Sequence, residues 1–506
     1  MDTGEKLLDR SEIDSIDTGT TVDPGTRKMD HSLIRSVAWN AAGDWISQIF
    51  SWASFLIVTR LLTPADFGIV AMAATIGPFV QYFAGCGIPR AIVTLRNLTD
   101  NQLAQLNSLG LLLGLGSFGV AALLAVPFAH FYRTPQLAPV LIVSCMGLIA
   151  GGAQTVSNGL LTREMRFRTL SLYAAISALV AAGVTLLLAL LRFGYWALVL
   201  GNLSAVIVRT VLVMRTRRQT YAVPRLDSVR EPLRFGWHVV ASLIALSIYG
   251  NLDHFTAGRM MGQTALGFYS MAMTLAYVPL DKVTSLVTLV LPSYLAAVQQ
   301  DLAAVRRYVR ILTENLALLT FPACIGFGMV ARELIPLALG PKWTGVVAPL
   351  QALSIYAAFR SVLALIPKVL TAVGNPRFVM WNDLAAIGIM GPAFYAGSHW
   401  GITGIAAAWV VAYPLVAAPL YRKTLATIKM TFGEYVRCLR PAMEGTIVMA
   451  LAVACVNYAL PHGELPVVRL GLEIVTGVAS YTGTLLIKHR ERIFTLVQMA
   501  KSFRRS

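Results

Sequence analysis

The chain has 506 residues, of which 56% are hydrophobic and only 13% are charged, and its formal net charge is +17. A soluble domain carries roughly 25% charged residues, so this chain has too few charges to cover a water-facing surface of its length. The basic residues lie in short loops between long apolar runs, which excludes the nucleic-acid partner that such a charge would suggest in a soluble protein. The five cysteines have no paired spacing, and we expect no metal and no cofactor.

Residues 1–33 are polar and lack the apolar core of a signal peptide, so we expect a disordered cytosolic tail. A membrane helix needs about 20 mainly apolar residues. Such runs recur along the rest of the chain and predict an all-α, polytopic protein of fourteen transmembrane helices. The predicted spans are 36–59, 67–89, 103–131, 136–161, 170–191, 195–214, 235–258, 265–292, 311–331, 345–372, 377–398, 401–421, 441–460 and 467–487.

The Lys and Arg residues between these spans alternate loop by loop. With the N-terminus inside, the cytoplasmic segments hold 30 of them and the outer loops hold seven. Cytoplasmic loops carry the excess of positive charge in membrane proteins, and a missed helix would invert the pattern from that point on. We therefore predict a multi-pass protein of the cell inner membrane with both termini in the cytoplasm.

An internal repeat joins the two halves of the chain. RLLTPADFGIVAMAATI (60–76) aligns without gaps to RMMGQTALGFYSMAMTL (259–275), at an offset of 199 residues. Since six helices separate the copies, both run through the membrane in the same direction. This is a parallel repeat, as in transporters that rock two bundles around a central cavity.

These two motifs resemble the polysaccharide transporter family of the multidrug/oligosaccharidyl-lipid/polysaccharide (MOP) flippase superfamily. The first reads R-L-L-x-P-x-D-F-G, the second reads G-R-M-M-G-x-x-A-L-G-F-Y-S-M-A, and the resemblance covers about residues 30–490. It implies two six-helix lobes around a cavity with two accessory helices. The implied parts are an N-lobe (34–215), a basic cytoplasmic linker (216–233), a C-lobe (234–422), helices 13–14 (440–487) and a basic amphipathic tail (488–506).

The resemblance also implies an activity. Such proteins move an undecaprenyl-pyrophosphate-linked oligosaccharide from the cytoplasmic to the periplasmic leaflet by alternating access, for O-antigen, exopolysaccharide or capsule synthesis. They use no ATP-binding cassette, and this chain has no GxxxxGK[ST] loop. A polysaccharide polymerase and a chain-length regulator are the partners that the resemblance implies, beside the lipid-linked substrate and the membrane lipids.

An anionic headgroup needs a wet, cationic path, and ionisable residues inside a membrane are functional candidates by default. Arg360 lies near the middle of an apolar run, and its guanidinium suits phosphate oxygens. It is either a headgroup contact or part of an ion pair between helices. Arg209, near the cytoplasmic end of helix 6, either contacts the headgroup or extends to the interface.

Four further charges lie in the first two helices of each repeat. Asp44 and Asp253 belong to helices 1 and 7 and are candidates for ion coupling or for a structural ion pair. Asp281 and Lys282 are adjacent in helix 8, hence about 100° apart, and cannot pair well with each other. Each of those two could instead meet a partner across the cavity.

Three arginines lie at the helix ends. Arg60 and Arg259 are the equivalent pair on the outer rim. They either guide the headgroup or, as we favour, cap the C-terminal carbonyls of helices 1 and 7. Arg90, at the inner end of helix 2, either attracts the anionic substrate or, more simply, anchors the helix.

Two other functional classes compete with a flippase. A drug/ion antiporter of the same superfamily would share the lobes but usually stops at twelve helices. A membrane polymerase or ligase typically needs a large outer loop with catalytic residues, and no outer loop here exceeds about twenty residues. We therefore expect a transporter and not an enzyme.

Overall fold

The computed structural model describes residues 48–85, 88–94, 98–224, 247–281, 301–459 and 466–490. All regular structure within these ranges is helical. Nine of the described helices are long and apolar enough to cross a membrane, and up to 10 if the bent pair Gln48–Leu61 and Pro64–Gly77 counts as one span. Each of the fourteen predicted spans overlaps a described helix, so the predicted all-α membrane fold is confirmed.

The first group of helices, here called the N-bundle, consists of residues 48–61 and α3 to α8. Within it α5 packs on α6, α7 packs on α8, and α3 contacts α5, α6 and α8. The bounds are α3 (Pro64–Gly85), α4 (Ile88–Thr94), α5 (Asp100–Phe131), α6 (Leu137–Arg163), α7 (Phe167–Leu190) and α8 (Tyr195–Thr216).

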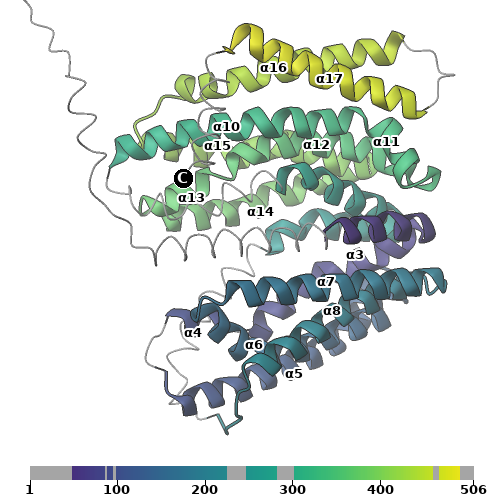
Figure 1. Ribbon diagram of the computed structural model, residues 1–506, viewed down its shortest axis with the longest axis vertical. Coiled ribbons are helices and arrows are strands. Elements are labelled where there is room, and N and C mark those ends of the chain that lie inside the picture. The colour runs from purple at the N-terminus through teal and green to yellow at the C-terminus, as the bar shows by residue number, and fades with distance from the viewer. Residues whose placement is uncertain are drawn as a thin grey trace, which may run out of the picture.

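The second group, here called the C-bundle, consists of the helical residues 247–281 and all later elements. Helix α10 packs on α12 and α16, α14 packs on α15, and α16 packs on α17 at the edge of the molecule (Figure 1). The bounds are α10 (Leu302–Met329), α11 (Ala331–Ala338), the 3-10 helix η1 (Pro341–Val346), α12 (Val347–Leu363), α13 (Ile366–Ala372), α14 (Pro376–Ser398), α15 (Gly401–Thr427), α16 (Phe432–Ala459) and α17 (Pro466–Lys488).

Two helices begin nine residues before their predicted spans. Helix α10 starts at Leu302 rather than 311, and α16 starts at Phe432 rather than 441. Asp301 caps α10, because its carboxylate accepts hydrogen bonds from the backbone N–H groups of Ala303 and Ala304. A search for apolar runs stops at the first charges, whereas these helices continue through a charged turn.

The two repeats meet where their second helices cross. The helix 48–61 and α3 are bent by 119° relative to each other, and the equivalent turn in the C-bundle lies at Gly262, whose φ is +80°. A Cβ added at Gly68 would lie 1.7 Å from the carbonyl oxygen of Gln263, and one added at Gly267 would lie 1.8 Å from that of Pro64. Both contacts need glycine, because only a residue without Cβ lets backbones approach so closely.

The largest cluster of buried apolar side chains extends across this crossing. It includes Ile69 and Met72 of α3, Met271 and Ala272 of the C-bundle, and Trp343 of η1. The two bundles therefore share one packed core near the crossing point, and this core fixes the positions of residues from the two bundles relative to each other.

Candidate functional site

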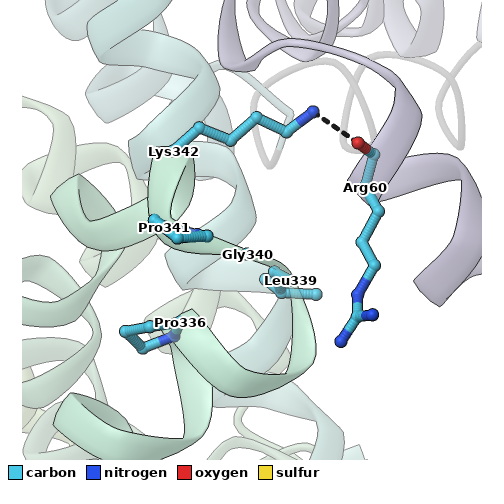
Figure 2. A pocket seen from close by; sticks show the side chains of 6 residues that line it. All are labelled: Arg60, Pro336, Leu339, Gly340, Pro341 and Lys342. Carbon is cyan, nitrogen blue, oxygen red and sulfur yellow. Dashed lines mark hydrogen bonds between the residues drawn. The ribbon is translucent and has the colours of Figure 1, made fainter.

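Polar contacts join the bundles at one end of the molecule, here called the Arg60 end. The Arg60 Nε–H donates to the carbonyl oxygen of Ala338 at 2.9 Å, and its Nη2 donates to that of Leu337. In return, the Lys342 ammonium donates to the backbone carbonyl of Arg60 at 2.8 Å (Figure 2). Arg60 and Lys342 line a pocket between the first helix and the turn from α11 to η1, together with Pro336, Leu339, Gly340 and Pro341.

Trp343 seals the same end from inside. Its side chain is fully buried, and its indole N–H donates to the carbonyl oxygen of Thr59 at 2.8 Å. The rings of Phe67 and Phe268, one from each repeat, both meet the indole edge-to-face. We call the contacts of Arg60, Lys342 and Trp343 with the opposite bundle the seam.

The partner of Arg60 corrects the predicted cap. Arg60 does bind the last carbonyls of a helix, as a guanidinium near a helix C-terminus should. That helix is α11 of the other bundle, however, and not the arginine's own helix. Arg259 does not cap its own helix. Its guanidinium instead lies 5.4 Å from the ring centroid of Phe131, at the end of α5 in the N-bundle. Each rim arginine therefore reaches across to the opposite bundle.

The motif T-P-x-D-F-G folds this end locally. The Asp66 carboxylate accepts from the backbone N–H and the hydroxyl of Thr63, which caps α3, and Pro64 occupies the first turn. The other Asp66 oxygen accepts from the backbone N–H of Tyr195 at 3.1 Å and so ties the starts of α3 and α8 together. The motif thus places Phe67 against the indole and Gly68 at the crossing.

A cavity of about 320 Å³ lies between α3 and the C-bundle helices 247–281. The hydroxyls of Thr75, Ser270 and Thr274 and the amide of Asn251 donate to carbonyl oxygens of their own helices. The side-chain oxygens of Asn251, Ser270 and Thr274 remain able to accept further hydrogen bonds, whereas that of Thr75 also pairs with the Tyr132 hydroxyl at 3.2 Å. The cavity wall therefore suits a ligand that carries many hydroxyl donors.

Arg360 lies behind one wall of this cavity. Its guanidinium carbon is 5.2 Å from the ring centroid of Tyr277, which lines the cavity, and 5.8 Å from that of Tyr356. Its Nη1 donates to the Tyr356 hydroxyl at 2.7 Å. Within the described residues no carboxylate lies within ion-pair distance, so the alternative of an ion pair between helices finds no partner there. A cation held by aromatic rings and one hydroxyl keeps its charge available to an anion.

Asp253 is fully buried and belongs to a hydrogen-bond network inside the C-bundle. One oxygen accepts from the backbone N–H of His254 and contacts its Nδ1 at 2.9 Å. The other accepts from the Tyr269 hydroxyl at 2.7 Å and from the Trp409 indole N–H at 3.1 Å. The described partners of Asp253 include no Arg or Lys, and the imidazole of His254 faces the cavity.

The other candidates are not brought to this cavity. Arg209 is half-buried on α8, which packs on α6 and α7, and Asp281 is exposed at the end of the helical residues 247–281. Asp44 and Lys282 lie outside the described residues, as does the side chain of Arg90 in α4.

The sequence reasoning missed several residues that the fold places at the seam and the cavity. Lys342 and Trp343 appeared only as part of an outer loop, and His254 and Tyr277 were not considered. The adjacency of Asp253 and His254 within an apolar run was a usable signal, since both are rare inside membranes. For Lys342 and Trp343 no local pattern names a partner more than 280 residues away.

Sequence comparison places the chain among proteins of polysaccharide biosynthesis. The family described as "Polysaccharide biosynthesis protein" matches residues 57–348, which is more than half of the 506 residues. The succinoglycan biosynthesis transport protein ExoT of Rhizobium meliloti is 24% identical over 481 residues, covering 93% of this chain and 96% of the relative. The lipopolysaccharide biosynthesis protein WzxC of Escherichia coli is 25% identical over 334 residues, covering 65% of this chain and 68% of the relative.

Solved structures share the fold. The lipid II flippase MurJ, in an inward closed conformation, superposes with a TM-score of 0.72 at 13% identity, over 90% of this chain and all of that chain. An inward-facing multidrug resistance transporter of the MATE family, from the MOP superfamily, superposes with a TM-score of 0.60 at 14% identity, over 76% and 94% of the two chains. These likenesses show that the chain shares the fold of these two transporters.

Proposed function

Because the chain belongs to the polysaccharide biosynthesis protein family of MOP flippases, we propose that it flips an undecaprenyl-pyrophosphate-linked oligosaccharide from the cytoplasmic to the periplasmic leaflet. The family consists of membrane transport proteins, so the activity is transport and not catalysis. The identity of the substrate and the direction of transport are inferred from the cavity and from the charges around it.

Arg360 carries the proposal. A charge inside a membrane protein is costly unless it has a partner, and such charges mark substrate or ion paths. The described surroundings of Arg360 offer aromatic rings and one hydroxyl but no acid within ion-pair distance. A pyrophosphate would supply the missing negative charge, and the planar guanidinium matches two phosphate oxygens at once. A cationic drug would instead be repelled, which argues against the antiporter alternative.

The cavity beside Arg360 suits the sugar part of the same ligand. Its side-chain oxygens accept hydrogen bonds, and sugar hydroxyls donate them. Tyr277 separates the cavity from the guanidinium, so one movement of this ring would join the two subsites. The phosphates would then lie on Arg360 and the first sugars between α3 and the C-bundle.

The seam supports alternating access. With the predicted orientation, in which both termini are cytoplasmic, the Arg60 end faces the periplasm and is closed in this structure. Outward release of the substrate then requires the seam to separate. A polymerase and a chain-length regulator would take up the substrate on that side.

The test is deletion of the gene, complemented with the wild type, Arg360→Ala or Arg360→Lys. We expect Arg360→Ala to lower surface polysaccharide at least about 10-fold, the factor that about 1.4 kcal/mol of lost headgroup binding gives. Undecaprenyl-linked units should accumulate inside, and Arg360→Lys should restore part of the export because it keeps the charge. Arg332→Ala, which removes an exposed arginine of α11, is the matched control.

Two results would contradict the proposal. Wild-type polysaccharide levels in the Arg360→Ala strain would remove Arg360 from the headgroup path. Normal polysaccharide in the deletion strain, together with a lowered tolerance of cationic drugs, would assign the protein to the antiporters instead.

A further inference from the structure

A buried cluster of charges joins α16 and α17 to α11 near the Arg60 end. The Arg469 Nε of α17 lies 3.2 Å from an oxygen of Glu333 in α11 and 3.6 Å from an oxygen of Glu473 in α17. The same guanidinium donates to the side-chain oxygen of Asn457 in α16 at 3.1 Å and to its backbone carbonyl at 3.2 Å. Three helices therefore meet on one arginine.

The acids of this cluster outnumber the base. Glu473 is 0% exposed and Glu333 is 9% exposed, so neither can use water to stabilise a negative charge. Both oxygens of Glu473 and one of Glu333 have no hydrogen-bond partner. A buried carboxylate without donors is strongly unfavourable, and binding of a proton removes that cost.

No other described charge compensates the excess negative charge of this cluster. On α11 the side chain of Arg332 is exposed, and on η1 Lys342 donates to the carbonyl of Arg60. Helices α10 and α16, which also pack on α17, bring no described charged side chain within ion-pair distance of either acid. His462 and Glu464 lie outside the described residues.

We infer that Glu333 and Glu473 form a proton-binding site: the two carboxyls share one proton and, with Arg469, fasten α17 to α11. The protonated carboxyl donates its O–H toward the other carboxylate, and Arg469 neutralises the remaining charge. The cluster is then neutral, as its burial requires. Loss of the proton leaves two negative charges beside one guanidinium and weakens the contact between α17 and α11.

The position of α11 gives this site a consequence for the seam. The two carbonyl groups that accept hydrogen bonds from Arg60 belong to Leu337 and Ala338, the last residues of α11. The same eight-residue helix is thus held by α17 on one side and by the N-bundle on the other. The proton site therefore steadies the surface on which the two bundles close.

The test is thermal unfolding of the full chain in lipid nanodiscs between about pH 6 and about pH 9, a range above the ordinary titration of glutamate. At the acidic end of this range the folded chain binds one proton more than the unfolded chain, so the stability of the wild type should fall as the pH rises until the folded chain has lost this proton. We expect a decrease in Tm of roughly 2–4 °C. Glu473→Gln and Glu333→Gln, which keep a neutral side chain of the same shape, should remove this pH dependence.

The matched control is Glu444→Gln, in the middle of α16. Glu444 is partly exposed and already pairs with Arg440, so this variant should keep the wild-type pH dependence. His462→Gln should keep it as well. Infrared spectra of the wild type should contain a protonated-carboxyl band that disappears as the pH rises and that is missing from either Gln variant which folds.

Several outcomes would overturn the site. An unchanged Tm of the wild type across the range, or absence of the carboxyl band, would show that no proton is shared. Loss of the pH dependence in His462→Gln would assign the titration to that histidine. Stabilisation of the wild type by Na⁺ but not by protons would identify a cation site instead. None of these measurements uses transport, so they leave the proposed function untouched.

Discussion

Gly68 and Gly267 make the same backbone contact from opposite sides of the bundle interface. Gly68 faces the carbonyl of Gln263, Gly267 faces the carbonyl of Pro64, and the members of each equivalent pair differ by 199 residues. An axis that relates the repeats must pass between these contacts. The repeat seen in the sequence is therefore also the symmetry of the interface.

This contact predicts a strong effect of a single methyl group. Gly68→Ala and Gly267→Ala each place a Cβ within 2 Å of a backbone oxygen, so the bundles have to move apart. We expect a loss of about 1–3 kcal/mol in the stability of the closed seam, the usual cost of overpacking. Thermal unfolding of the purified variants would measure it. Gly183→Ala, on α7, meets no atom within 4 Å and should behave as the wild type.

The polar contacts of the seam predict how readily the Arg60 end opens. Arg60→Ala removes two hydrogen bonds and Lys342→Met removes one. Because all three hydrogen bonds are exposed to solvent, each variant should cost about 1 kcal/mol. The open fraction should then rise roughly five-fold. The readout is labelling of Leu339→Cys, a buried seam position, by an impermeant maleimide in a chain whose native cysteines are replaced by serine. Equal labelling of the chains with and without Arg60 would show that this arginine does not hold the Arg60 end closed. Arg332→Ala serves as the control.

The network of Asp253 predicts a graded loss of stability. Asp253→Asn keeps one acceptor for the indole of Trp409 and the hydroxyl of Tyr269 and should cost about 1–3 kcal/mol. Asp253→Leu removes the acceptor of the buried Tyr269 hydroxyl and leaves the Trp409 indole with only that hydroxyl as its acceptor, so it should cost about 3–5 kcal/mol. Chemical or thermal unfolding measures both. Asp301→Asn, at the start of α10, should be close to neutral, since asparagine caps helices as well as aspartate does; equal losses in the two Asp253 variants would contradict the network.

The hydroxyl of Tyr356 predicts a smaller effect on export. Tyr356→Phe removes the described hydrogen bond to the Arg360 guanidinium but keeps the ring against which it lies. The arginine should lose its fixed position and keep its charge, so we expect export to fall a few-fold, less than in Arg360→Ala. Quantification of surface polysaccharide in the complemented deletion strain would test this. A loss as large as that of Arg360→Ala would mean that the tyrosine contacts the substrate itself.

Much of the fold was predictable because each span is encoded locally. A run of about 20 apolar residues and the alternation of basic loops depend on neighbouring residues only. Arg360 was identifiable in the same way, as a charge within an apolar run. The partners of Arg60 lie 277 and 278 residues along the chain, and no periodicity encodes such pairings. The predicted cap was consequently assigned to the wrong helix, although its chemistry was correct.

The close backbone contact at Gly68 and Gly267 has a consequence for how the seam opens. Contacts between atoms lose a quarter to a half of their attraction within about 0.5–1 Å of separation, and hydrogen bonds weaken over a similarly short distance. The contacts at the crossing and at the seam therefore break together, before the bundles have moved far apart. Such an interface has no stable half-open position. Each molecule is then either shut or open, and a ligand changes only the fraction of molecules that is open.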